Sequence, residues 1–172
     1  MNELMSEYES LYNNTISHSE RLNNRIGNSI AIITVLGTGN ILVWKEYFTK
    51  PINTIYLILC FIALLSFIVT MILFYRAYSG YTYAYFPIED IASKISETIE
   101  LTKNDTDNGE RCNNHIRGMM GRTYLRCAVE NTKQNIIKNN RYKKFITSVV
   151  FSFIAIAIAY GFSIGIINNS HI

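Results

Sequence analysis

Residues 52–75 read INTIYLILCFIALLSFIVTMILFY, and no charged side chain interrupts them. A helix rises about 1.5 Å per residue, so about 20 apolar residues cross the roughly 30 Å hydrocarbon core of a bilayer. Residues 145–167, FITSVVFSFIAIAIAYGFSIGII, meet the same condition. Both runs are therefore predicted to be transmembrane helices.

A third apolar run lies earlier in the chain, at residues 28–48. Gly37, Gly39 and Asn40 interrupt it, but each of its many Ile, Leu and Val residues contributes about 0.3–0.6 kcal/mol to membrane insertion. A cleavable signal sequence is not expected here, because a long polar segment precedes the run and no small-x-small site closes it. We therefore predict a third span.

The composition of the whole chain agrees with this assignment. Of its 172 residues, 49% are hydrophobic and only 17% are charged, which is more apolar than an ordinary soluble domain. The predicted fold class is an all-α integral membrane protein with three transmembrane helices, a cytosolic helical hairpin and an N-terminal amphipathic helix. The hairpin is assigned to residues 76–144, the amphipathic helix to residues 1–27 and a short external tail to residues 168–172.

The distribution of Lys and Arg predicts the orientation in the membrane. Twelve of them lie in residues 76–144, whereas the tail at 168–172 carries none. Positive residues stay on the cytoplasmic side, so the N-terminus and the hairpin are predicted to be cytoplasmic and the C-terminus external. Basic and tyrosine residues before the third span, RYKK at 141–144, are predicted to anchor it at the lipid headgroups.

The cytosolic segments show helical periodicity. Met5, Tyr8, Tyr12 and Ile16 fall on one face of the N-terminal segment, and this face needs a partner surface, which we expect residues 87–144 to supply. Pro87 opens a second predicted helix, whose isoleucines recur on one side at 88, 91, 95 and 99. A turn at TKNDTDNGE follows, and a third helix is predicted from about residue 118 or earlier into the last span.

The two arms of the hairpin differ in charge. Residues 87–110 hold seven acidic and two basic residues, whereas residues 111–144 hold nine basic residues and one acid, Glu130. Either the arms neutralise each other, or the basic arm binds a phosphate-bearing cytosolic ligand through Arg122, Arg126 and Lys133, which recur at helical spacing. Tyr124 is a candidate for stacking on a base, or it packs inside the hairpin.

Small and weakly polar residues form rows along the spans. The rows are Cys60, Ala63, Ser66 and Thr70 in the second span, and Ser148, Ser152, Ala155 and Ala159 in the third. A further row is Ala157, Gly161 and Gly165. Such rows favour close helix packing, and because three spans have a limited interior, several such faces predict contacts between copies and hence a homo-oligomer. Thr34 and Thr38 are candidates to line a narrow pore, since hydroxyls tolerate water; simple helix packing is the alternative.

Several functions are disfavoured by what the sequence lacks. No Asp, Glu, Lys, Arg or His lies in the centre of a predicted span, so an ion-coupled carrier is not expected. There is no Gly-rich phosphate loop, zinc-ligand spacing or HExxH motif, so neither enzyme activity, a cofactor nor a metal is expected. Three cysteines, Cys60, Cys112 and Cys127, are expected to be free thiols.

Four stretches together resemble a family of bacterial proteins. They are NNRIGNSIAIITVLG at 23–37, the closely spaced first two spans, PIEDIASKISETIEL at 87–101, and NTKQNIIKNNRYKKF at 131–145 before the last span. This layout resembles the small membrane effectors of nucleotide-signalled anti-phage defence, namely the Pycsar transmembrane effectors and the SLATT group.

The resemblance implies an oligomeric effector in the bacterial inner membrane that depolarises or permeabilises the bilayer. A cytosolic nucleotide second messenger or oligonucleotide would control it. The residues leave a second hypothesis open, in which the protein is a non-conducting membrane anchor or sensor and its hairpin recruits a protein partner on the cytosolic side.

Overall fold

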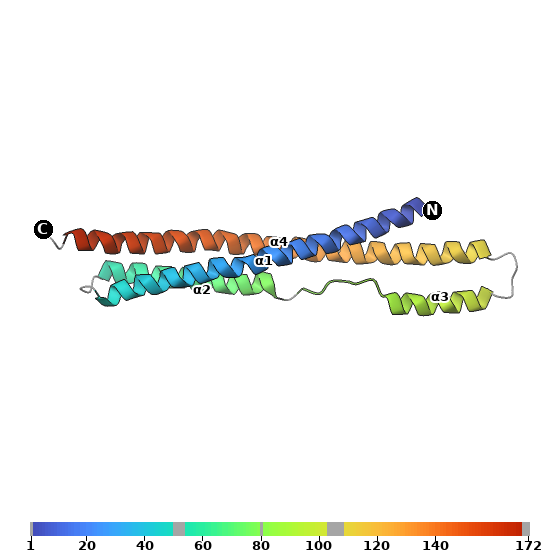
Figure 1. The fold of residues 1–172 in the computed structure, drawn as a ribbon, viewed down its shortest axis with the longest axis horizontal. Coiled ribbons are helices and arrows are strands. Elements are labelled where there is room, and N and C mark those ends of the chain that lie inside the picture. The colour runs from blue at the N-terminus through green and yellow to red at the C-terminus, as the bar shows by residue number, and fades with distance from the viewer. Residues whose placement is uncertain (1, 50–53, 80, 103–108, 170–172) are drawn as a thin grey trace. The chain divides into compact units, whose positions relative to one another are not determined.

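The computed structural model describes residues 2–49, 54–79, 81–102 and 109–169, and within these ranges every regular element is a helix. The four helices, in chain order, are α1 (Asn2–Thr49), α2 (Thr54–Tyr78), α3 (Ile88–Thr102) and α4 (Gly109–Asn169) (Figure 1). The prediction of an all-α fold is thus confirmed. The predicted external loop at 50–53, most of the predicted turn, at 103–108, and the end of the tail at 170–172 lie outside the described residues.

Helices α1 and α4 each join a predicted cytosolic helix to a predicted span without interruption. Both prolines of the chain, Pro51 and Pro87, lie outside them, so nothing removes a backbone donor within either helix. Pro87 instead precedes α3, where its carbonyl accepts a hydrogen bond from the Ile91 N–H at 3.1 Å. The positions of the two prolines are therefore compatible with long, uninterrupted α1 and α4 and with the start of α3.

Three of the helices, α1, α2 and α4, contain a stretch long and apolar enough to cross a membrane, by length and composition. The fourth helix, α3, has 15 residues and carries acidic side chains in its first turn. The predicted number of membrane-compatible helices is confirmed.

The chain forms two compact units. One, here called the span unit, comprises residues 22–80 and 138–172; the other, the head unit, comprises residues 1–21 and 81–137. The span unit contains most of the apolar residues, and the head unit contains α3 together with the first parts of α1 and α4.

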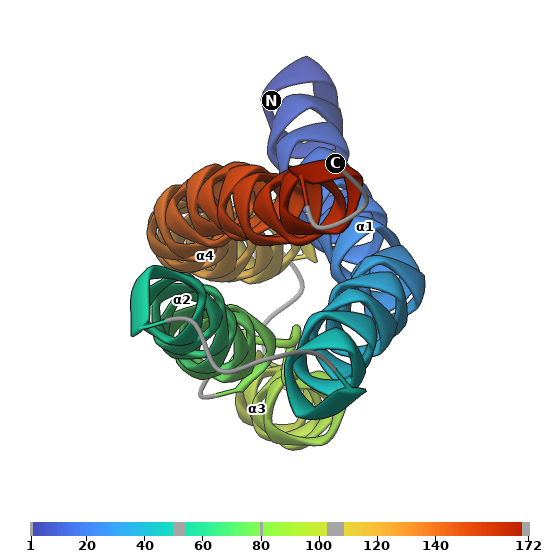
Figure 2. The same cartoon turned by 90° about the vertical axis from the view of Figure 1, so that its left-hand side faces the viewer.

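The span unit is a three-helix bundle, as the end-on view in Figure 2 shows for α1, α2 and α4. Its interior contains two clusters of buried apolar side chains, one around Tyr56 and Ala159 and the other around Leu36 and Phe145. The polar rows of α2 and α4 meet there, since Thr70 Oγ1 lies 2.8 Å from Ser148 Oγ and 2.9 Å from Ser152 Oγ. These rows therefore hold the helices of one chain together.

In the head unit, the first part of α1 packs along α4. A Cβ atom at Gly121, which is buried, would lie only 3.0 Å from Tyr8 Cδ2, so the absence of a side chain permits this close approach. One turn further along each helix, the rings of Tyr12 and Tyr124 lie with their centroids 5.6 Å apart. The apolar face of the N-terminal segment thus has α4 as its partner.

Candidate anion-binding site

The site is built on a short extended stretch, residues 81–87, here called the connecting segment. Extended backbone outside a sheet needs other partners for its N–H and C=O groups. Asn131, which is fully buried on α4, supplies both for Ala84: its Oδ1 accepts from the Ala84 N–H at 2.8 Å, and its Nδ2 donates to the Ala84 carbonyl at 3.0 Å. One side chain thereby fixes the segment against α4.

Further side chains hold the connecting segment on either side of Ala84. The Tyr83 hydroxyl donates to Asn135 Oδ1 at 3.2 Å, and the Phe86 N–H donates to the Tyr12 hydroxyl at 3.1 Å. Phe86 also stacks on Tyr124, with ring centroids 4.0 Å apart. Tyr83 thus makes a specific contact within the head unit.

Tyr124 lies within this packing. It is partly buried between Phe86 and Tyr12, and burial raises the pKa of its phenol. It lines none of the three hollows described next. Of the two predicted roles for Tyr124, packing inside the head unit is the one that this geometry fits.

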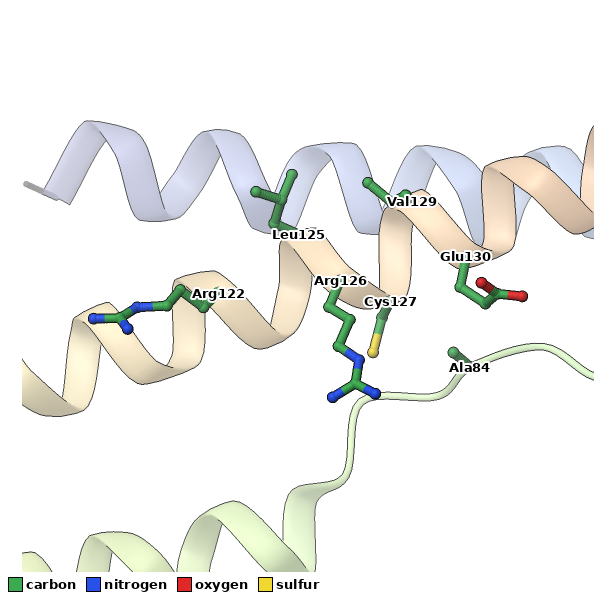
Figure 3. Close-up of a pocket in the computed structure, with 7 residues that line it drawn as sticks. All are labelled: Ala84, Arg122, Leu125, Arg126, Cys127, Val129 and Glu130. Atoms are coloured by element: carbon green, nitrogen blue, oxygen red, sulfur yellow. The ribbon is translucent and has the colours of Figure 1, made fainter.

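A hollow of about 580 Å³ lies between α4 and the connecting segment (Figure 3). Arg126 and Cys127 point towards the connecting segment, Arg122 extends along the helix, and Glu130 lies at the other end. The hollow is lined by Ala84, Arg122, Leu125, Arg126, Cys127, Val129 and Glu130. It combines two cations with an apolar surface and one carboxylate.

Two smaller hollows adjoin the first along α4. One, of about 260 Å³, is lined by both arginines together with His115, Met119 and Thr123. The other, of about 230 Å³, lies between α1 and α4 and also includes Arg122. Arg122 therefore contributes to all three hollows, and Arg126 contributes to two.

Both arginines are exposed, and neither forms a hydrogen bond or ion pair in the described part of the chain. A guanidinium carries five N–H donors in a planar fork. Glu130 is a neighbour in the first hollow, but one of its oxygens accepts from Gln134 Nε2 at 3.1 Å. The donors of Arg122 and Arg126 are consequently available to an anion from outside the chain.

Lys133, the third predicted ligand, is exposed on the same face of α4 but does not line the hollows. At 100° per residue, four exposed cations of α4 within the head unit fall in a sector about 60° wide, here called the cationic stripe: Arg111, Arg122, Arg126 and Lys133. Arg111 and its neighbour on the same face, His115, were missed as site residues. Arg111 and His115 lie eleven and seven positions before Arg122, and this helical spacing indicates that they share its face of α4.

The acidic residues of α3 are also without partners in the head unit. Glu89, Asp90, Glu97 and Glu100 are all exposed, and none of their carboxylates forms an ion pair or hydrogen bond among the residues that the structure describes. Among the described residues, no ion pair joins these carboxylates to α4. The structure thus does not support the interpretation in which the two arms neutralise each other within one chain. Both charges remain open to other partners.

Thr34 and Thr38 lie on the exposed side of α1 in the span unit. Each hydroxyl donates at 3.0 Å to the carbonyl four residues earlier, on its own helix. The packing candidates Ala157, Gly161 and Gly165 are likewise exposed on α4, and a Cβ added to either glycine would meet no atom within 4 Å. All five residues face outward from one chain.

The three cysteines are free thiols, as predicted. In the head unit, the Cys127 thiol lies 3.7 Å from the Tyr85 carbonyl, to which it donates, and burial raises the pKa of this thiol. Among the described residues, no group of His, Cys, Asp and Glu side chains is arranged to hold a metal ion.

No protein family, curated protein or solved structure matches this chain. Its class is therefore defined by the fold: an all-helical protein with three membrane-compatible helices and a separate head unit that carries unpaired arginines. The resemblance to Pycsar and SLATT effectors stays a prediction.

Proposed function

We propose that the protein is an oligomeric membrane effector of bacterial anti-phage defence, which forms a gated pore or disrupts the inner membrane when a cytosolic nucleotide-type signal binds. The observation that carries the proposal is the pair of exposed, unpaired arginines, Arg122 and Arg126, which line adjoining hollows on the helix that also contributes a span.

The chemistry of the hollows supports an anionic ligand. Residues four apart on a helix lie about 5–6 Å from each other at Cβ, so both guanidinium groups can contact one phosphate. Charge-assisted hydrogen bonds of this type contribute about 1.5–3 kcal/mol each. Leu125 and Val129 offer apolar surface beside the cations, and the volume of about 580 Å³ falls in the range of small-molecule sites.

The continuity of α4 offers a route from ligand to membrane. Residues of the hollow and residues of the third apolar run belong to one uninterrupted helix, Gly109–Asn169. A ligand can shift the equilibrium between two arrangements of the protein only to the extent that it binds one arrangement more tightly than the other. The connecting segment, held by Asn131, is the element through which the ligand would act on α2.

The outward position of five residues in the span unit supports assembly of several copies. Ala157, Gly161 and Gly165 present a smooth surface on α4, which allows close approach of a neighbouring helix in lipid. In our proposal Thr34 and Thr38 face the pore formed between copies. The orientation, with the head unit cytoplasmic and the C-terminus external, rests on the twelve Lys and Arg residues of 76–144.

A binding experiment tests the ligand part of this proposal. Purified full-length protein should bind labelled nucleotides, and Arg126→Glu should weaken this binding at least about tenfold, the effect of losing one charge-assisted contact of roughly 1.4 kcal/mol. Lys94→Glu, an equal change of charge at an exposed site on α3, is the matched control. Equal binding by both variants and the wild type would remove Arg126 from the site.

The second candidate function, a non-conducting anchor or sensor, is favoured by the unpaired acidic residues and exposed Ile88 and Ile99 of α3, which offer a docking surface for a protein. A pull-down from membranes separates the two functions. A sensor brings a stoichiometric soluble partner, whereas a self-sufficient pore brings mainly other copies of itself.

A further inference from the structure

The carboxylates of α3 lie together on one face of the helix. At 100° per residue, Glu89, Asp90, Glu97 and Glu100 fall within a sector about 100° wide, here called the acidic face. Ile91, which is only 5% exposed, lies roughly opposite this sector. The head unit thus buries Ile91 on the apolar side of α3 and leaves the carboxylates unpaired, while Ile88 and Ile99 stay exposed.

The acidic face matches in length the part of the cationic stripe from Arg122 to Lys133. Glu89 and Glu100 are eleven positions apart, and so are Arg122 and Lys133, which corresponds to about 16 Å in each case. Between these ends, Glu97 is three positions from Glu100, and Arg126 is four positions from Arg122. Two antiparallel helices can therefore place three opposite charges against each other.

We propose that the acidic face of α3 in one copy docks on the cationic stripe of α4 in a neighbouring copy. In this arrangement Glu100 faces Arg122, Glu97 faces Arg126 and Glu89 faces Lys133. The inference rests on the homo-oligomer of the proposed function, but it does not depend on the identity of the signal.

The presence of an exposed acidic face and an exposed cationic stripe on one chain favours a second copy of this chain as the occupant. Val129 and Ile136, 61% and 57% exposed, lie at one edge of the stripe and add apolar surface beside it. A nucleic acid or an anionic lipid surface would match the cations but would leave the acidic face without a partner. Copies held in one membrane also meet at high effective concentration.

A consequence for regulation follows from the shared arginines. Arg122 and Arg126 cannot hold an anionic ligand and the neighbouring carboxylates with the same donors. The signal and α3 of the next copy consequently compete, so signal binding releases α3 and changes the contact between copies.

Cross-linking between two differently tagged copies tests the docking. Each copy has its native cysteines replaced, Cys60→Ala, Cys112→Ser and Cys127→Ser; one then carries Glu97→Cys and the other Arg126→Cys. A short bismaleimide added to membranes should link the two tagged copies. The control copy carries Ala92→Cys, at an exposed site outside the acidic face, in place of Glu97→Cys. We expect about tenfold less link with this control, a ratio that corresponds to roughly 1.4 kcal/mol of pairing.

Charge reversal tests the register. Glu89→Lys with Glu100→Lys in the first copy should abolish the link, and Arg122→Glu with Lys133→Glu in the second copy should restore it. Raising salt from about 0.1 M to about 1 M shortens the screening length from about 10 Å to about 3 Å and should also reduce the link. Restoration by paired reversal supports the docking, whereas a link insensitive to charge overturns it.

Three other outcomes also overturn the inference. A link that forms only inside a single chain carrying both cysteines would show that α3 folds onto its own α4. Tags that co-purify without a link would leave the oligomer intact and reject this interface. Tags that do not co-purify would reject both the interface and the oligomer of the proposed function.

Discussion

At the scale of single residues, Asn131 holds the connecting segment of the head unit against α4. Its amide satisfies both backbone groups of Ala84 in a site where Asn131 itself has no exposed surface. A buried polar group that loses its partner costs about 1–3 kcal/mol. Asn131 therefore contributes strongly to the attachment of the connecting segment, together with the contacts of Tyr83 and Phe86.

We predict that Asn131→Leu destabilises the protein by about 2–4 kcal/mol, because two backbone groups of Ala84 lose their partner together. Asn140→Leu, a change of the same type at an exposed site of the same helix, should have little effect. Thermal unfolding in detergent measures both variants, and limited proteolysis should detect release of the connecting segment only in Asn131→Leu. Equal stability of the two variants would contradict this role.

Lys138 is a buried cation outside the predicted spans. It is 3% exposed, its Nζ donates to Asn23 Oδ1, and burial lowers the pKa of its ammonium group below the usual 10.5. Because the folded-state pKa is below the unfolded one, the unfolded state holds the proton to higher pH. The energetic cost of burying this charge is present at neutral pH and decreases as the pH rises towards 10.5.

The predicted pH dependence is measured by comparison with Lys138→Met, which cannot titrate. The free energy of unfolding of the wild type should increase relative to that of the variant as the pH is raised from about 7 towards 10.5. Melting temperatures of both proteins across this range report the difference. A difference that stays constant with pH would show that burial does not perturb Lys138.

At the scale of whole elements, the sequence predicts the helices well because Pro and apolar periodicity act locally. Pro87 precedes α3, and the charge-free run at 52–75 coincides with α2 over its described part. The start of α4, predicted at about residue 118 or earlier, is at Gly109, since no proline interrupts this segment. The contacts of the connecting segment are not predictable in this way, because its partners lie 38 to 74 positions away.

The polar rows of α2 and α4 lead to a prediction about helix association. Thr70→Val removes a buried hydroxyl that contacts two serines of α4, and it should lower stability by about 0.6–1.7 kcal/mol. Thr38→Val is the matched control, since that hydroxyl bonds only to its own helix and faces outward. Unfolding in mixed detergent micelles compares the two; an equal loss would mean that the row does not join the helices.

At the scale of the whole molecule, charge and hydrophobicity are segregated along the chain. The segregation is visible in the sequence, and it predicts both the membrane-compatible helices and the cationic arm with Arg122 and Arg126. Whether Tyr124 faced a ligand or the interior was not predictable, because this depends on Phe86, 38 positions earlier in the chain. The outward position of Thr34 was not predictable either, since it depends on which face of α1 packs against α2 and α4.

The most direct test of the central claim, a gated membrane effector, is the membrane potential of induced cells, followed with a voltage-sensitive dye. Cells express the wild type or the Thr34→Leu, Thr38→Leu variant at equal levels in the membrane, with and without phage challenge. Our account predicts that challenged wild-type cells depolarise and that the variant, with leucines in place of the pore hydroxyls, does not. Unchanged potential in wild-type cells under both conditions, despite correct insertion, would contradict the account and favour the anchor or sensor.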